Sequence, residues 1–141
     1  QHASDEEWAQ FQNILTEGKA HREKTGKSLM VGRWDIVPIP EHLRGHMGKN
    51  VLMEFPAETA QSMYDFRAND VIADISPRPV LLFHAADDSV TPTDQSLQLF
   101  AHAKQPCDLI LASDVDHFPF SLDSTRARDA VKGWLDVYFP A

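Results

Sequence analysis

The chain has 141 residues, of which 43% are hydrophobic, so it is long enough for one modest domain with a buried core. A formal net charge of −8, from 21 acidic and 13 basic residues, argues against a nucleic-acid surface, and no apolar run reaches the roughly 18 residues of a membrane span. The single cysteine, Cys107, excludes an intrachain disulfide framework and a cysteine-based zinc site.

The first half of the chain, residues 1–70, is polar and punctuated by glycine and proline, and it is expected to be mostly helical. Ser4 and Glu7 have the spacing of a capping box, which predicts a helix that begins at Ser4. Gly18 is expected to weaken or end that helix. Aromatic residues such as Phe11 and Phe55 either line a pocket or pack the segment. The other expected elements are a strand or extended arm over 29–37, a helical turn over 41–46, an ambiguous segment over 51–55 and a helix over 58–66.

In the second half, residues 71–141, short apolar strands alternate with helical patterns, which is typical of an α/β layer fold. A strand–helix–strand order predicts parallel strands joined by a right-handed crossover, and parallel strands are normally buried on both faces. The expected elements are a strand over 80–84, a helix from near Thr91 or Thr93 with Leu97, Phe100 and Ala101 on its apolar face, a strand over 109–112 and a last helix from near Asp123 or Ser124.

Two side chains with catalytic potential follow the two strands. Asp88 lies four residues past the first strand, and His117 lies a few residues past the second. Reacting groups of parallel α/β sheets gather beyond the carboxyl ends of the strands, so the two loops are expected side by side. An Asp carboxylate there can accept the Nδ1–H of the imidazole and stabilise the imidazolium that forms when a serine is deprotonated. Taken singly, either residue is more often a turn residue or a bystander, so the inference depends on the pair.

From about Ile75 to the C-terminus the sequence resembles the C-terminal portion of the α/β-hydrolase superfamily, in its serine esterase-like branch. Residues 77–84, PRPVLLFH, are similar to the family's penultimate strand, which commonly ends in His-Gly-x-x-Asp. The resemblance implies that Asp88 is the triad acid and that His117, in the segment Asp-His-Phe, is the triad histidine.

The sequence departs from the family pattern at two positions near these residues. Ala85 stands where glycine is usual, a mild change because alanine still fits a tight turn. Asp116 stands where a small residue is common. A second carboxylate there can either raise the pKa of His117 or compete with Asp88 as its partner.

A nucleophile is missing from the pattern. No Gly-x-Ser-x-Gly, the strand-to-helix turn that presents a catalytic serine, occurs in the 141 residues. The family order is Ser, Asp, His, so the resemblance implies that the serine and the oxyanion-hole amides belong upstream of residue 1. Four local serines lack the context of such a turn and are not expected to replace it: Ser76, Ser89, Ser113 and Ser121.

The leading hypothesis is a C-terminal fragment of a serine-dependent α/β hydrolase that hydrolyses a small-molecule ester or amide through an acyl-enzyme. In it, residues 1–70 form a cap or connecting segment, and residues 71–141 form a strand–helix–strand–helix unit of the hydrolase core. His117 acts as general base and then general acid, and Asp88 orients it. No metal or organic cofactor is implied.

The alternative is a catalytically inert fragment or interaction module. Two apolar strands without neighbours expose a sheet edge, so we expect the chain to associate with a second polypeptide that carries the serine, or with itself. Nucleic acid and membrane are not expected as partners. No leader is visible in the polar opening residues, so a cytoplasmic location is expected, although a chain without an initiator Met can be a processed piece.

Overall fold

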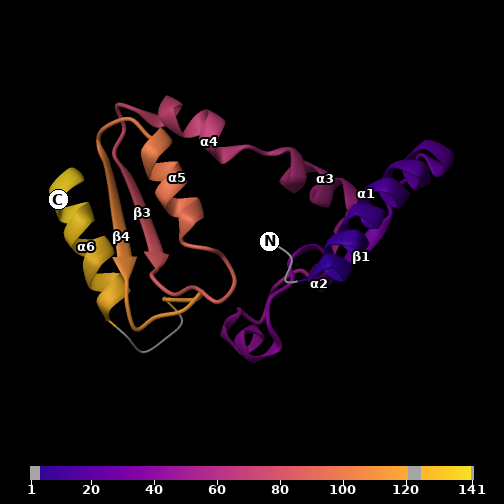
Figure 1. The fold of residues 1–141 in the computed structure, drawn as a ribbon, viewed down its shortest axis with the longest axis horizontal. Coiled ribbons are helices and arrows are strands. Elements are labelled where there is room, and N and C mark those ends of the chain that lie inside the picture. The colour runs from indigo at the N-terminus through magenta and orange to yellow at the C-terminus, as the bar shows by residue number, and fades with distance from the viewer. Residues whose placement is uncertain (1–3, 121–124, 141) are drawn as a thin grey trace. The chain divides into compact units, whose positions relative to one another are not determined.

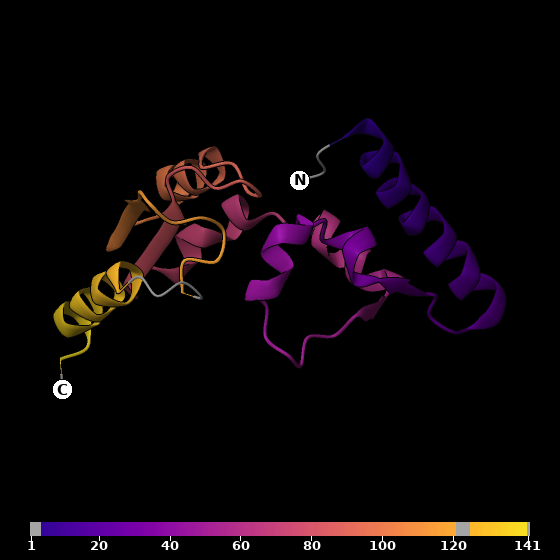
Figure 2. The ribbon, with the colours of Figure 1, turned by 90° about the horizontal axis from the view of Figure 1, so that it is seen from below.

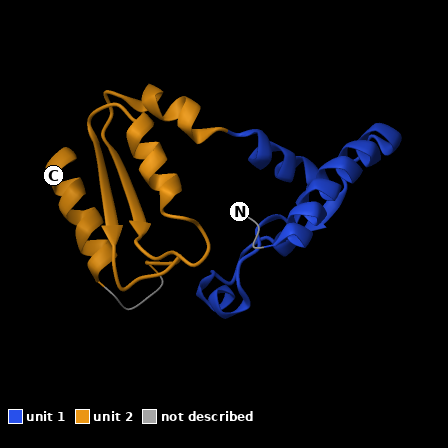
Figure 3. Ribbon diagram, viewed as in Figure 1, with its two compact units in different colours: residues 1–66 blue, residues 67–141 orange. Residues whose placement is uncertain are grey.

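The structure is a computed structural model that describes residues 4–120 and 125–140 (Figure 1). The chain divides into two compact units, unit 1 over residues 1–66 and unit 2 over residues 67–141 (Figure 3). Both contain helices and short strands, so the mixed α/β class that the sequence predicts is confirmed. Among the described residues, no helix is both long and apolar enough to span a bilayer. The assignment of the two halves as cap and hydrolase core remains a prediction.

Unit 1 is built on a long helix and an antiparallel pair of short strands. Strands β1 and β2 pair with Val31 opposite Phe55. The predicted helical turn over 41–46 and the predicted helix near 58–66 are confirmed, whereas the arm over 29–37 is divided between a strand and a helix. The elements are α1 (Asp5–Thr25), β1 (Met30–Gly32), α2 (Arg33–Ile36), the 3₁₀ helix η1 (Glu41–His46), β2 (Glu54–Pro56) and α3 (Ala57–Asp65).

Helix α1 begins as predicted but ends later. The Ser4 side chain caps it by accepting the amide of Glu7 at 3.2 Å, and Gly26 ends it in the left-handed conformation at φ 73°. The expectation that Gly18 weakens or ends the helix is wrong. A Cβ at Gly18 would lie 2.4 Å from the Cβ of Ala57, so this glycine instead lets α1 and α3 approach each other closely.

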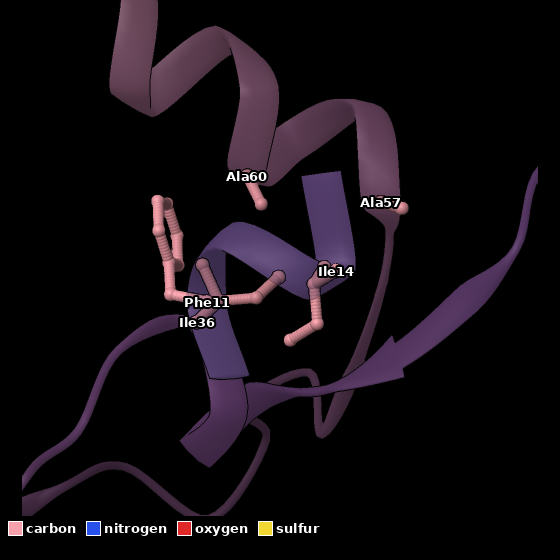
Figure 4. Close-up of a cluster of buried hydrophobic side chains, with 5 residues drawn as sticks. All are labelled: Phe11, Ile14, Ile36, Ala57 and Ala60. Carbon is pink, nitrogen blue, oxygen red and sulfur yellow. The ribbon is translucent and has the colours of Figure 1, made fainter. Parts of the chain in front are cut away.

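The core of unit 1 lies where α1, α2 and α3 meet (Figure 4). Phe55 and Leu15 are partly buried and pack against it. Phe11 is only 5% exposed, so it packs the core and does not line a pocket. The buried members of the cluster are Phe11, Ile14, Ile36, Ala57 and Ala60.

Unit 2 contains two parallel strands and two longer helices. Strands β3 and β4 pair in register from Val80 opposite Cys107 to Ala85 opposite Ala112. Helix α5 connects the strands, and α5 and α6 lie on opposite sides of the sheet (Figure 1, Figure 2). The elements are α4 (Ala68–Val71), the 3₁₀ helix η2 (Ile72–Ile75), β3 (Val80–Ala85), α5 (Asp94–His102), β4 (Cys107–Ala112) and α6 (Arg126–Tyr138).

Helix boundaries in unit 2 differ slightly from the prediction. Thr93 is the N-cap residue of α5, so the helix begins at Asp94 and Pro92 precedes it. The predicted start of the last helix near Asp123 or Ser124 lies outside the described residues. The described part of α6 begins at Arg126.

The strands of unit 2 are less buried than parallel strands normally are. Only Ala85, Cys107 and Ala112 of the two strands are buried, and Leu111 is 40% exposed. The face of α5 that was expected to pack is exposed instead, at Leu97, Phe100 and Ala101. A sheet of two strands has two open edges and covers little area, so the described residues of unit 2 cannot bury these apolar faces by themselves.

Candidate active site

The loops that follow β3 and β4 leave the sheet at the same edge, because Ala85 pairs with Ala112 at the carboxyl ends of the strands. They bring together the two residues singled out in the sequence. Nδ1 of His117 lies 3.1 Å and 3.0 Å from the two carboxylate oxygens of Asp88. A carboxylate can only accept, so Nδ1 carries the hydrogen, and Nε2 of the neutral ring is left as a proton acceptor.

Asp88 is held in place by the turn that it begins. Its Oδ1 accepts the amides of Val90 at 2.8 Å and Thr91 at 2.7 Å, as short Asx turns do. The Asp88 side chain is 6% exposed, against 25% for His117. Burial by itself raises the pKa of Asp88, but the hydrogen bonds from the Thr91 amide, the His117 ring and the Val90 amide outweigh it, and the pKa is lowered. Asp88 is therefore a charged acceptor near neutral pH.

A second imidazole approaches the same carboxylate. Nε2 of His84 donates to the carbonyl of Thr91 at 3.0 Å and lies 3.4 Å from Oδ2 of Asp88. Since a carbonyl only accepts, Nε2 carries a hydrogen, and Nδ1 of His84 is in contact with the hydroxyl of Ser96. One nitrogen of this imidazole thus contacts a backbone carbonyl, and the other contacts a side-chain hydroxyl. Its approach to Asp88 was not anticipated, although the His-x-x-x-Asp spacing contains the signal.

The carboxylate of Asp116 bonds neither ring nitrogen of His117. It accepts the amide of Ser89 at 2.9 Å, the hydroxyl of Ser89 at 3.0 Å and 2.9 Å, and the amide of His117 at 2.7 Å. Burial tends to raise the pKa of Asp116, but the bonds from Ser89 and from the His117 amide prevail and lower it. Asp116 thus joins the two loops beside the Asp88–His117 contact and does not replace Asp88 as the partner of the imidazole.

The local serines have other partners. The hydroxyl of Ser89 donates to Asp116, the hydroxyl of Ser76 donates to the carbonyl of Gln105 at 2.8 Å, and the hydroxyl of Ser113 accepts from Arg126 at 2.8 Å. Ser121 lies outside the described residues. The aromatic ring next to the histidine is Phe118, whose centroid lies 4.9 Å from the His117 ring at 77°.

The chemistry available at this edge of the sheet is proton transfer. An imidazole with its hydrogen fixed on Nδ1 by a buried carboxylate presents Nε2 as a base of defined direction. No group of three or more His, Cys, Asp or Glu side chains within residues 4–120 and 125–140 is placed to hold a metal ion.

Comparisons with known proteins support the fold. No family model matches the chain. Over 52 residues, 37% of this chain, it is 40% identical to the uncharacterised protein YfhR of Escherichia coli K12 and to YfhR of Salmonella typhimurium, a match that covers 18% of each. The crystal structure of the α/β hydrolase GrgF from Penicillium sp. sh18 matches with a TM-score of 0.70 and 16% identity, over 96% of this chain.

The chain spans about half the length of GrgF, 51%, and its match covers less than a fifth of each YfhR protein. At 16% identity the structural likeness concerns the fold and not the activity. The predicted fold class is confirmed: the chain has the fold of part of an α/β hydrolase.

Proposed function

We propose that the chain supplies the acid and the histidine of a serine-dependent hydrolase that acts on a small-molecule ester or amide. The observation that carries the proposal is the contact between Nδ1 of His117 and the buried carboxylate of Asp88, at 3.0 Å to its nearer oxygen. The two residues come from loops at the carboxyl ends of paired parallel strands, where α/β sheets hold their reacting groups. The α/β-hydrolase fold is consistent with this reaction, but the fold by itself is not evidence for the reaction.

In the proposed reaction, Nε2 of His117 takes the proton of a serine hydroxyl while the serine oxygen bonds to the substrate carbonyl carbon. Asp88 stabilises the imidazolium that forms and keeps the ring oriented. The imidazolium then gives its proton to the departing alcohol or amine, and an acyl-enzyme remains. His117 next deprotonates a water that attacks the acyl-enzyme, and it returns the proton to the serine as the acid product leaves.

The serine comes from polypeptide outside these 141 residues, because no Gly-x-Ser-x-Gly occurs in them. The sheet of unit 2 has open edges at which a strand of that polypeptide can pair. Strands β3 and β4 form a two-stranded sheet in the described residues, which leaves each strand one edge for a further strand. Leu111 of β4 is 40% exposed, and such an apolar side chain gains burial when a further strand and its helix dock. The proposed partner is the polypeptide that carries the serine, and self-association is the competing outcome.

The alternative is an inert interaction module, and the missing nucleophile favours it. Such a module has no need of an imidazole whose hydrogen is directed onto a buried acid. The Asp88 carboxylate accepts two amides and one ring N–H from two different loops, an arrangement that orients His117 and does nothing for an exposed sheet edge. This difference makes the hydrolase the better supported of the two functions.

The test begins with the chain purified under native conditions from its source and exposed to a fluorophosphonate probe. Intact masses are then measured under denaturing conditions, and the labelled peptide is sequenced. The proposal predicts one labelled serine within a Gly-x-Ser-x-Gly, either on a polypeptide that accompanies this chain or on a longer polypeptide that contains it. A boiled sample serves as the control. A folded sample without any labelled serine would refute the hydrolase and support the inert module.

A further inference from the structure

Ser89 follows Asp88 directly, and Asp116 directly precedes His117. The pair Ser89–Asp116 therefore lies one residue away from the pair Asp88–His117 on both loops. Each pair is joined by two or more hydrogen bonds, so the loops after β3 and β4 are tied at two adjacent points. Of these two ties, one involves the proposed catalytic groups, and the other involves residues for which the reaction has no chemical use.

The Asp116 carboxylate accepts hydrogen bonds from three groups. Its two oxygens accept the amide and the hydroxyl of Ser89, and Oδ1 also accepts the amide of His117 at 2.7 Å. The last bond fixes the backbone from which the imidazole projects. A hydrogen bond to a charged group typically contributes more than one between neutral groups, so this tie restrains the histidine loop strongly.

The Asp88–His117 contact depends on such a restraint. The imidazole is a quarter exposed, and water competes for its Nδ1–H whenever the loop moves away from β3. Asp88 cannot supply the restraint, because its own turn fixes only the loop after β3, through Val90 and Thr91. Arg126 attaches the loop after β4 at Ser113, four residues before the histidine, and Asp116 attaches the loop directly beside His117.

We propose that Asp116 is a positioning residue for His117, which braces the histidine loop against Ser89 and so keeps Nδ1 of the imidazole on Asp88. The catalytic meaning of this brace rests on the proposed function. The brace itself is a property of the 141-residue chain, so it can be measured without a nucleophile.

The test is the imidazole N–H proton of His117, observed by NMR in the ¹⁵N-labelled chain. In the wild type, the Nδ1–H resonance is expected to be visible and slow to exchange with water, and Asp88→Asn assigns it by removing it. Asp116→Ala is expected to speed this exchange roughly tenfold or more, the effect of losing one or two net hydrogen bonds. Asp116→Asn, whose side-chain oxygen still accepts amides, is expected to restore most of the protection.

Ser89→Ala serves as a second, milder variant for the case in which Asp116→Ala fails to fold. It removes the hydroxyl but keeps the amide bond to Asp116, so a smaller rise, of a few fold, is expected. Asp87→Asn is the matched control, an exposed carboxylate next to Asp88, and should leave the exchange rate unchanged. Exchange rates that match the wild type in both Asp116→Ala and Ser89→Ala would overturn the brace. Failure of the hydrolase proposal would be recognised by a different result. No serine would be labelled by the fluorophosphonate, while the Nδ1–H proton of His117 would still exchange slowly.

Discussion

Unit 1 is organised mainly by a buried apolar core, whereas unit 2 is organised mainly by hydrogen bonds between its loops. Unit 1 closes a core of five buried residues around Phe11, to which α1, α2 and α3 all contribute. Unit 2 is built on two strands of strongly apolar sequence, but the buried cluster between their ends contains only Ala85, Ala112 and Val115. Its loops, in contrast, are densely hydrogen bonded around Asp88 and Asp116.

The difference shows which properties are local. Turns and side-chain hydrogen bonds form between neighbouring loops, so the hydrogen bonds around Asp88 and Asp116 form within the described residues of unit 2. Burial of a parallel sheet is not local, because each strand needs neighbours on both sides and helices over both faces. The unit with the open core also carries the proposed catalytic pair. This arrangement is expected if another polypeptide both covers the apolar strands and supplies the serine.

The largest expected effect concerns the proposed catalytic pair. In the completed protein, meaning this chain together with the proposed polypeptide that carries the serine, His117→Ala is expected to lower kcat for p-nitrophenyl acetate by about 10³-fold or more, because the proposed general base is lost. His102→Ala is the control, since that histidine is exposed on α5 and bonds the carbonyl of Gln98 in its own helix. A kcat for His117→Ala within a few fold of the wild-type kcat would show that His117 of unit 2 is not the general base.

A core substitution compares the two units directly. Phe11→Ala opens a cavity in unit 1 and is expected to lower the free energy of unfolding by about 3 kcal/mol. Leu111→Thr, at a strand position that is 40% exposed, is expected to cost less than about 1 kcal/mol in the chain alone. Urea denaturation followed by circular dichroism measures both. Equal costs would contradict the contrast between a closed and an open core.

Two glycines in helices sharpen the same comparison. Gly18→Ala is expected to destabilise unit 1 by about 1–3 kcal/mol, because the new Cβ meets Ala57 at 2.4 Å and the overlap outweighs the better helix propensity of alanine. Gly133→Ala in α6 meets nothing within 4 Å and is expected to stabilise unit 2 by about 0.5–1 kcal/mol. Thermal unfolding of both variants provides the measurement, and a stabilised Gly18→Ala would show that α1 and α3 are not packed closely.

The smallest expected effect is a dependence of stability on pH. The pKa values of Asp88 and Asp116 are lowered in the folded chain, so the unfolded state binds their protons more readily. Their contribution to stability is therefore complete above the ordinary Asp pKa, which is about 4, and is lost as the pH falls below it. Urea denaturation followed by circular dichroism at several pH values between about pH 6 and pH 3 should show this decline in the free energy of unfolding, and Asp116→Asn should flatten it. An unchanged slope in that variant would argue against the Ser89 and His117 bonds.

Sequence patterns were sufficient where the physics is short-range. The capping of α1 by Ser4 depends on residues three positions apart, and the presence of β3 and β4 follows from apolar runs between turn residues, although β4 begins at Cys107, two residues before its apolar run. The approach of Asp88 to His117 followed from strand order, since the ends of adjacent parallel strands meet. Their catalytic roles stay a prediction.

Sequence patterns failed where the outcome depends on a distant partner. Gly18 looks like a helix breaker until Ala57 is placed against it, and nothing in the sequence near Gly18 announces that contact. Leu97 and Phe100 have the spacing of a packed face, but whether such a face is covered depends on what lies above it. In the sequence Asp116 is only a carboxylate adjacent to His117 that could compete with Asp88, whereas its hydrogen bonds to Ser89 depend on how the two loops meet.

The most direct test of the central claim is the rate at which a fluorophosphonate labels the serine of the completed protein, measured for the wild type and for Asp88→Asn. The asparagine oxygen can still accept the amides of Val90 and Thr91, so the turn survives while the charge that stabilises the imidazolium is removed. The Asp88–His117 mechanism predicts that labelling slows by about 10³-fold or more, with Asp87→Asn labelled at the wild-type rate. Labelling of Asp88→Asn at the wild-type rate would contradict it.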